Sequence, residues 1–351
     1  MTTDAARTAT RLAWTRATLD DDTLTLEPAS ADASFRSYWR TWHHGQSWIV
    51  MDSPPEREDP RPWLAIGERL AAAGLHVPAV RAADLAQGFL LIEDLGSRLY
   101  LPALNDRSAD ALYGDAMDAL LRMQARMDAS ALPPFDHAML ASGLRVMPEW
   151  FLQRHLGHIP DARERQVLEA AFDVIIRNAL EQPRVFVHRD FHSRNLLIVE
   201  QANPSVMAPT LSNPGIIDFQ GALAGPLTYD LASLLRDAYI GWPRERVEGW
   251  VASYRRRLIH AGLIDSAIDH ARFLRWFDLT GLHRHLRVLG QFYRLWYRDG
   301  KPGYLADVPR VYGYVIDVAG RYPELTDLAA LLRQRVGARD LRMAEGLCDT
   351  R

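Results

Sequence analysis

The chain has 351 residues, a formal net charge of −3, 48% hydrophobic residues and 24% charged residues. This length can bury a large core and suggests two lobes, while the charge gives no electrostatic case for nucleic-acid binding. No apolar run is long enough to cross a bilayer, and residues 1–18 lack a signal-like segment, so we expect a cytoplasmic protein without membrane attachment. The single cysteine, Cys348, cannot form an internal disulfide.

Residues 1–20 have the pattern of a loosely amphipathic helix, and from residue 24 the pattern becomes typical of strands. Residues 24–26 lead into a loop of small residues, 28–34, and a strand of alternating pattern at 35–40. Such a loop can lay backbone N–H groups over phosphates, which makes Ser30 and Ser34 candidate nucleotide contacts. Because the loop contains no glycine, an ordinary hairpin explains it equally well. Further strands are expected at 46–52, 80–83 and 89–92.

The next long stretch is mainly helical. Apolar residues recur at helical spacing in a short segment of the N-terminal part, 63–70, and in most of the region after residue 96. We expect its helices at 111–127, 136–155, 161–181, 231–235, 244–261, 269–297, 308–319 and 325–335. The pattern predicts an α+β fold with an antiparallel-sheet lobe at 1–95 and a mainly helical lobe at 96–351.

The residues that carry chemistry lie at 185–199, where two apolar strands bracket a polar loop. The loop presents Asp190 and Asn195, and a later apolar run ends in Asp218. Two carboxylates and a carboxamide oxygen form a hard oxygen site that suits Mg²⁺ rather than zinc. Their order and spacing are those that phosphoryl transfer from ATP requires. We therefore expect ATP and Mg²⁺ as cofactors.

The basic residues are unusual, because Lys301 is the only lysine among 41 Lys and Arg residues. The strand at 46–52 has Met51 or Asp52 where kinase-like proteins carry a phosphate-binding lysine. Arg36 on the adjacent strand is our candidate substitute, and Glu68 is the candidate helix carboxylate.

Two readings other than a kinase remain open. His188, Asp190 and His192 alternate along the chain and could bind zinc in a hydrolase, although Asn195 and Asp218 would then have no role. The missing lysine would also fit a nucleotide-binding module without turnover.

The loop His-x-Asp-x4-Asn and the later Asp-Phe pair resemble the aminoglycoside phosphotransferase-like branch of the protein-kinase-like fold. The resemblance implies that Asp190 receives or orients the proton of the acceptor hydroxyl, and that Asn195 and Asp218 hold Mg²⁺. It also implies that the lobe at 1–95 binds the nucleotide and that the lobe at 96–351 holds the catalytic and substrate residues. We expect His188 to brace the loop and the Asp218 turn. The adenine edge would bind the backbone of Glu93, Asp94 and Leu95.

Other segments are similar to the bacterial sugar kinases that phosphorylate the anomeric hydroxyl of N-acetylmuramate and N-acetylglucosamine in peptidoglycan recycling. The likeness lies in 218–222, 225–237, 281–290 and 298–302, and extends from about residue 26 to 322. It implies a small amino sugar as substrate. Candidate substrate residues are His192, Arg236, Arg284 and His285. Aminoglycosides and choline-type alcohols are the alternative acceptors, but those cations usually require an acidic pocket, whereas these segments carry several arginines.

Overall fold

The computed structural model describes residues 4–31, 35–199 and 213–343, which fall into two compact units. The first unit lies within 1–108 and 194–221, and the second within 109–193 and 222–351. Residues 194–221, which include Asn195 and Asp218, thus pack with the N-terminal part of the chain. The predicted functional division into lobes at 1–95 and 96–351 stays a prediction.

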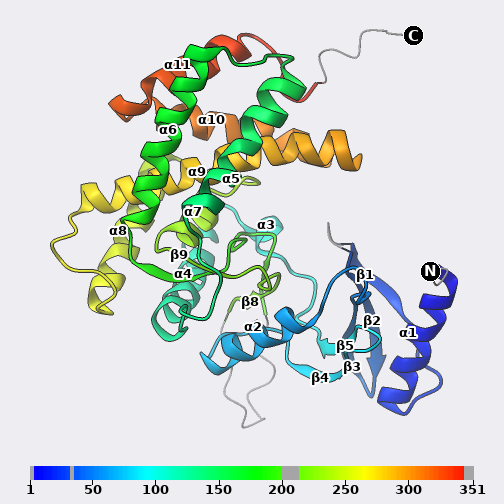
Figure 1. Cartoon of the computed structure of the whole chain (residues 1–351). Helices are drawn as coiled ribbons and strands as arrows, with labels where there is room; N and C mark the ends of the chain where they lie inside the picture. Colours follow the sequence, from blue (N-terminus) through cyan, green and yellow to red (C-terminus); the bar gives the residue numbers. More distant parts are fainter. Residues whose placement is uncertain (1–3, 32–34, 200–212, 344–351) are drawn as a thin grey trace, which may run out of the picture. The chain divides into compact units, whose positions relative to one another are not determined.

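The first unit is built on an antiparallel sheet of five strands in the order β1-β2-β3-β5-β4 (Figure 1). The strands are β1 (Glu27–Ala31), β2 (Ser37–His43), β3 (Gln46–Asp52), β4 (Val80–Asp84) and β5 (Phe89–Glu93). β3 is central, pairing with β2 from Ser37↔Asp52 to His43↔Gln46 and with β5 from Trp48↔Glu93 to Asp52↔Phe89. Its buried residues, Val50 and Met51, belong to the core of the sheet.

Helix α1 (Asp4–Leu19) packs on this sheet through ion pairs as well as apolar contacts. Leu19 joins Val50 in a buried cluster. Asp52, at the end of β3, accepts hydrogen bonds from Arg7 (2.6 Å from Nη2) and Arg11 (2.7 Å from Nη1). The carboxylate at the position expected for a lysine is therefore fully engaged with α1.

Helix α2 (Arg61–Ala72) positions the segment that carries Asp218. It buries Trp63, Ile66, Gly67 and Leu70, the i, i+3, i+4, i+7 pattern of one helix face. Trp63 packs on Phe219 with ring centroids 5.0 Å apart. A Cβ on Gly67 would lie 3.3 Å from the Phe219 ring, so glycine permits this close packing. α3 (Tyr100–Ala103) and the short pair β7 (Leu196–Leu197) and β8 (Gly215–Ile216) complete the unit.

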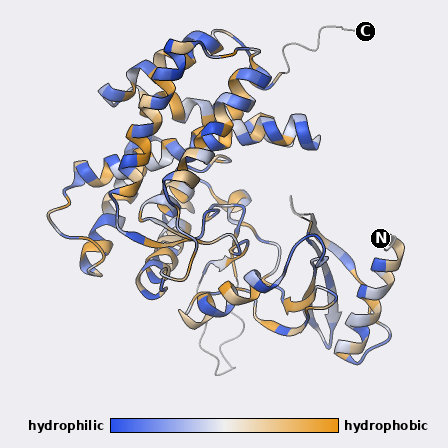
Figure 2. Ribbon diagram, viewed as in Figure 1, coloured by the Kyte–Doolittle hydropathy of each residue, from blue (hydrophilic) through white to orange (hydrophobic). Residues whose placement is uncertain are grey.

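The second unit is helical around α9 (His270–Asp299), whose residues from Phe273 to Tyr293 are mostly buried. Figure 2 shows hydrophobic and hydrophilic residues alternating around its helices, as expected for amphipathic helices that share a core. The other elements are α4 (Ala109–Arg126), α5 (His137–Met147), η1 (Pro148–His155), α6 (Ala162–Leu180), α7 (Tyr229–Leu235), α8 (Arg244–His260), η2 (Pro302–Asp307), α10 (Val308–Ala319), η3 (Pro323–Leu325), α11 (Thr326–Val336) and the strand pair β6 (Arg184–Val187) and β9 (Leu223–Pro226).

The α+β class and the antiparallel N-terminal sheet are confirmed. One expected helix, 136–155, is interrupted: α5 ends at Met147, and Pro148 begins a π-helical turn. Proline cannot donate the backbone hydrogen bond that an α-helix needs at that point. Within the described ranges, no helix is long and apolar enough to span a membrane.

Candidate active site

The loop after β6 that carries Asp190 is held by a buried carboxylate that the sequence did not single out. Asp230, in the first turn of α7, accepts hydrogen bonds from the backbone N–H groups of His188 (2.6 Å) and Arg189 (3.0 Å). Burial raises the pKa of Asp230 to about 7, against the effect of these donors. Arg189 has φ 79, a left-handed conformation that costs energy in a residue with a side chain. The two hydrogen bonds to Asp230 hold the backbone in this turn.

The same loop is fixed on either side of Asp190. The Asp190 N–H donates to Nδ1 of His188 (3.3 Å), which fits the bracing role predicted for this buried histidine. Further along, Ser193 donates through its N–H (3.0 Å) and its hydroxyl to Asp237. Asp237 is itself buried just beyond α7. The loop therefore presents Asp190 from a rigid frame, which is what positioning catalysis requires.

The side chain of Asp190 is 39% exposed and lies beside a buried arginine. Nη1 of Arg284 is 3.6 Å from the Asp190 carboxylate and donates to the Arg189 carbonyl at 2.9 Å. Desolvation would raise the pKa of Asp190, but the charges of Arg284, His192, Arg287 and Arg189 lower it to about 2. Asp190 is consequently ionised across the physiological pH range and can accept a hydrogen bond from a hydroxyl.

Aromatic rings continue from His192 within the second unit. The His192 ring meets Tyr239 edge-on with centroids 5.5 Å apart. Tyr239 neighbours Phe292 (6.3 Å), and Phe292 stacks on Tyr304 (5.1 Å). Apolar rings interrupted by a few polar groups are typical of small-molecule sites. His192, a candidate substrate residue, thus lies close to Asp190 in sequence and next to this aromatic row.

The candidate substrate residues Arg236 and His285 contact one another. His285 is buried and its Nε2 is 2.7 Å from the Arg236 carbonyl oxygen. Burial lowers the pKa of His285 to about 3, so the ring is neutral. The Arg236 guanidinium lies over the Tyr314 ring (5.0 Å) and 3.7 Å from Asp317. These contacts join α7, α9 and α10, and the substrate roles of both residues stay predictions.

In the first unit, the two predicted metal ligands lie together. Nδ2 of Asn195 is 3.3 Å from the Asp218 carboxylate, and the Ile217 N–H donates to the Asn195 carbonyl (3.1 Å). Asp218 has φ 64, and Gln220 donates to its other oxygen at 2.7 Å. A carboxylate next to a carboxamide is an oxygen donor set that suits Mg²⁺, so the residues present fit the expected ion.

Arg36 also reaches this carboxylate, and its proposed role as a substitute for the missing lysine stays a prediction. Its side chain is 3% exposed, with Nη2 3.3 Å from Asp218 and Nε 3.2 Å from Glu58. The Ser53 hydroxyl donates to the Glu58 carbonyl (2.8 Å) and fixes that loop. Glu68 is exposed on α2, so the carboxylate that pairs with the cation is Glu58. Proline-rich residues 54–60 gave no periodic pattern from which Glu58 could be recognised.

The predicted adenine-binding segment follows β5. Glu93 donates its N–H to the Ala79 carbonyl (2.8 Å), and its carboxylate is 3.2 Å from His76. Asp94 forms a bidentate pair with Arg40 (2.6 and 3.0 Å), and Leu95 is buried. Ser30 lies in β1 opposite Tyr38, whereas Ser34 lies outside the described residues. Nucleotide contacts of these residues stay predictions.

One observation concerns the alternative of a zinc site. The described parts of the chain contain no group of three or more His, Cys, Asp or Glu that could hold a metal ion.

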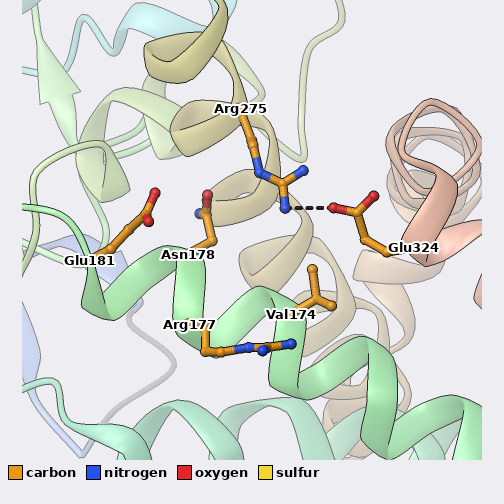
Figure 3. Close-up of a pocket in the computed structure, with 6 residues that line it drawn as sticks. All are labelled: Val174, Arg177, Asn178, Glu181, Arg275 and Glu324. Atoms are coloured by element: carbon orange, nitrogen blue, oxygen red, sulfur yellow. Dashed lines mark ion pairs between the residues drawn. The ribbon is translucent and has the colours of Figure 1, made fainter. Parts of the chain in front are cut away.

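A surface pocket of about 340 Å³ lies in the second unit between α6, α9 and η3, and Figure 3 shows its lining side chains. There Arg275 pairs with Glu324 at 2.6 Å, and Glu181 accepts a hydrogen bond from Trp276. No predicted site residue lines this pocket.

Solved structures show which class of protein has this fold. An ethanolamine kinase from Plasmodium vivax matches with a TM-score of 0.60 at 10% identity, covering 91% of this chain and 89% of its own. The ADP-bound aminoglycoside phosphotransferase APH(2'')-Ib matches with a TM-score of 0.55 at 16% identity, covering 86% and 96%. The protein-kinase-like fold is thereby confirmed.

Sequence comparison is more specific. Residues 25–277 match the phosphotransferase enzyme family, and the chain belongs to that family. A Pseudomonas putida protein named N-acetylmuramate/N-acetylglucosamine kinase is 44% identical over 315 residues, covering 90% of this chain and 89% of that protein. A protein of the same name from Pseudomonas aeruginosa is 45% identical over 308 residues, covering 88% and 87%.

Proposed function

We propose that this chain is an ATP-dependent sugar kinase that phosphorylates the anomeric hydroxyl of N-acetylmuramate and N-acetylglucosamine to the 1-phosphate. The observation that carries the proposal is the 44% identity, over 90% of the chain, with a relative of that name. The contacts of Asp190, Asn195 and Asp218 support kinase chemistry in particular. The reaction would recover cell-wall amino sugars, and its need for ATP supports a place in the cytoplasm.

On the acceptor side, Asp190 orients the attacking hydroxyl. The rigid loop and the neighbouring Arg284 keep the carboxylate ionised and aimed. A carboxylate of such low pKa is a weak base, so it accepts the proton late, when the oxygen–phosphorus bond is already forming. Positioning and charge neutralisation supply most of the catalysis in phosphoryl transfer.

On the nucleotide side, Asn195 and Asp218 would hold Mg²⁺, which neutralises the phosphates and orients them. Arg36 supplies the cation that this family usually obtains from lysine, and Glu58 holds the guanidinium in place. Arginine carries several donors in a fixed plane and binds phosphate oxygens in pairs, so the replacement preserves the function. Gln220 fixes the orientation of the Asp218 carboxylate.

The charges around Asp190 favour a neutral or anionic acceptor over a cationic aminoglycoside or choline-type alcohol. Arg189, Arg284 and Arg287 all act on the Asp190 carboxylate. A cationic substrate brought to the same carboxylate would meet three like charges, which costs energy in a partly desolvated site.

The product tests the proposal. Purified protein is incubated with Mg-ATP and each sugar, and the reducing end is assayed together with phosphorus–proton coupling to the anomeric proton. We expect loss of the reducing end and a 1-phosphate. A 6-phosphate, or phosphorylation of an aminoglycoside with no sugar turnover, would overturn the substrate assignment.

A further inference from the structure

Arg287 is a charged side chain that acts on the Asp190 carboxylate from a distance, and the proposed reaction gives it no direct contact with the substrate. It lies on α9, three residues after Arg284, and therefore on the same side of the helix and less than one turn away. Arg287 is partly exposed, and it makes no hydrogen bond or ion pair with the parts of the chain that the structure describes.

The stem of this arginine is supported by a glycine. A Cβ on Gly143 of α5 would lie 3.4 Å from Cδ of Arg287, so the aliphatic part of the side chain covers the bare backbone there. A held stem with an unsatisfied planar head is a preorganised anion receptor, because little side-chain entropy is lost when a ligand binds.

The charges that face Arg287 come from each neighbouring element. On its own helix Arg284 is engaged with the Arg189 carbonyl and Asp190, and Arg294 lies two turns further along. The catalytic loop contributes Asp190, and α5 presents Gly143 beside the neutral, buried His283. Arg284 is already paired, and Arg294, whose Nε has no partner in the described chain, is ten residues further along α9 than Arg284 and is influenced by Glu149 and Asp299. Within the described residues, Arg287 is therefore the unpaired arginine next to Arg284 on this helix.

We propose that Arg287 binds the carboxylate of an acidic sugar and gives the enzyme a preference for N-acetylmuramate over N-acetylglucosamine. This rests on the proposed function. The two sugars differ by a lactyl ether on C3, two ring carbons from the reacting C1. With the C1 hydroxyl at Asp190, beside Arg284, the lactyl carboxylate needs a cationic partner a few ångströms away, and Arg287 lies about 4.5 Å further along the helix axis, less than one turn.

The test is the ratio of kcat/KM for the two sugars in Arg287→Met. Loss of a charge-assisted hydrogen-bonded pair should reduce kcat/KM for N-acetylmuramate about 10- to 100-fold. The value for N-acetylglucosamine should change less than about threefold, because that sugar has no carboxylate to bind, and because Arg284 and His192, the larger positive influences on Asp190, remain in the variant. Arg298→Met is the matched control: it removes one positive charge from the same helix at an exposed residue paired with Asp299, and both values should stay at the parental level.

A second measurement removes the charge from the ligand. The methyl ester of N-acetylmuramate should be a poorer substrate than the free acid for the parent, but an equal one for Arg287→Met. Equal losses of kcat/KM for both sugars in the variant would show that Arg287 acts only through Asp190. An unchanged ratio of the two kcat/KM values would show that Arg287 does not bind the carboxylate. Either result overturns the inference, whereas a parent that phosphorylates neither sugar overturns the proposed function instead.

Discussion

Replacing Arg36 tests whether this arginine supplies the positive charge at the nucleotide phosphates that kinase-like proteins obtain from a lysine. Arg36 Nη2 lies 3.3 Å from the Asp218 carboxylate in a buried setting. Two unit charges at that separation interact by about 5 kcal/mol at an effective dielectric constant near 20, as an upper bound. Because Asp218 is one-third exposed, we take the range of hydrogen bonds to charged groups, about 1.5–3 kcal/mol. If Arg36 makes one such bond to a nucleotide phosphate, its loss corresponds to a decrease of about 10- to 150-fold in Mg-ATP affinity.

The assay is titration of Arg36→Met with Mg-ATP by calorimetry, together with KM for ATP and for the sugar. Arg36→Lys should recover part of the affinity, since it restores the charge without the planar donor set. Arg81→Met is the control, because Arg81 belongs to the same sheet but stacks on Trp48. A dissociation constant within twofold of the parent, in a variant that is fully folded, would refute the role of Arg36.

Three other substitutions address the catalytic and metal residues. Asp190→Asn should keep Mg-ATP binding but lower kcat by about 10²–10⁴-fold, and a rate within a few-fold of the parent would remove Asp190 from the base role. Asp218→Ala should weaken Mg-ATP binding and flatten the Mg²⁺ dependence of the rate; unchanged Mg²⁺ titrations would place the metal elsewhere. Arg284→Met removes the main positive charge that lowers the pKa of Asp190 from its ordinary value to about 2. The pKa should rise by about 1–3 units, so the acid limb of kcat/KM should move to higher pH; an unmoved limb would contradict this.

Most of the fold could be predicted from periodic patterns. The helices around α9 and the strands of the sheet have regular apolar spacing, and local spacing also singled out Asp190, Asn195 and Asp218 as candidates. The supporting residues were not predictable in the same way. Asp230 and Asp237 bind the catalytic loop from more than 40 residues further along the chain, and Glu58 pairs with Arg36 from an irregular segment. Such contacts depend on tertiary packing, which leaves no local pattern.

The division of the chain has a consequence for biosynthesis. Residues 194–221 belong to the same compact unit as residues 1–108, and Phe219 fills the space over Gly67 on α2. A ribosome that has completed residue 108 must still add 113 residues before residue 221 exists, about ten seconds at ordinary translation rates. During this interval the face of α2 that contains Trp63 has no Phe219 to cover it. The nascent N-terminal unit therefore exposes apolar surface of the kind that chaperones bind. For the same reason, residues 1–108 expressed alone should aggregate.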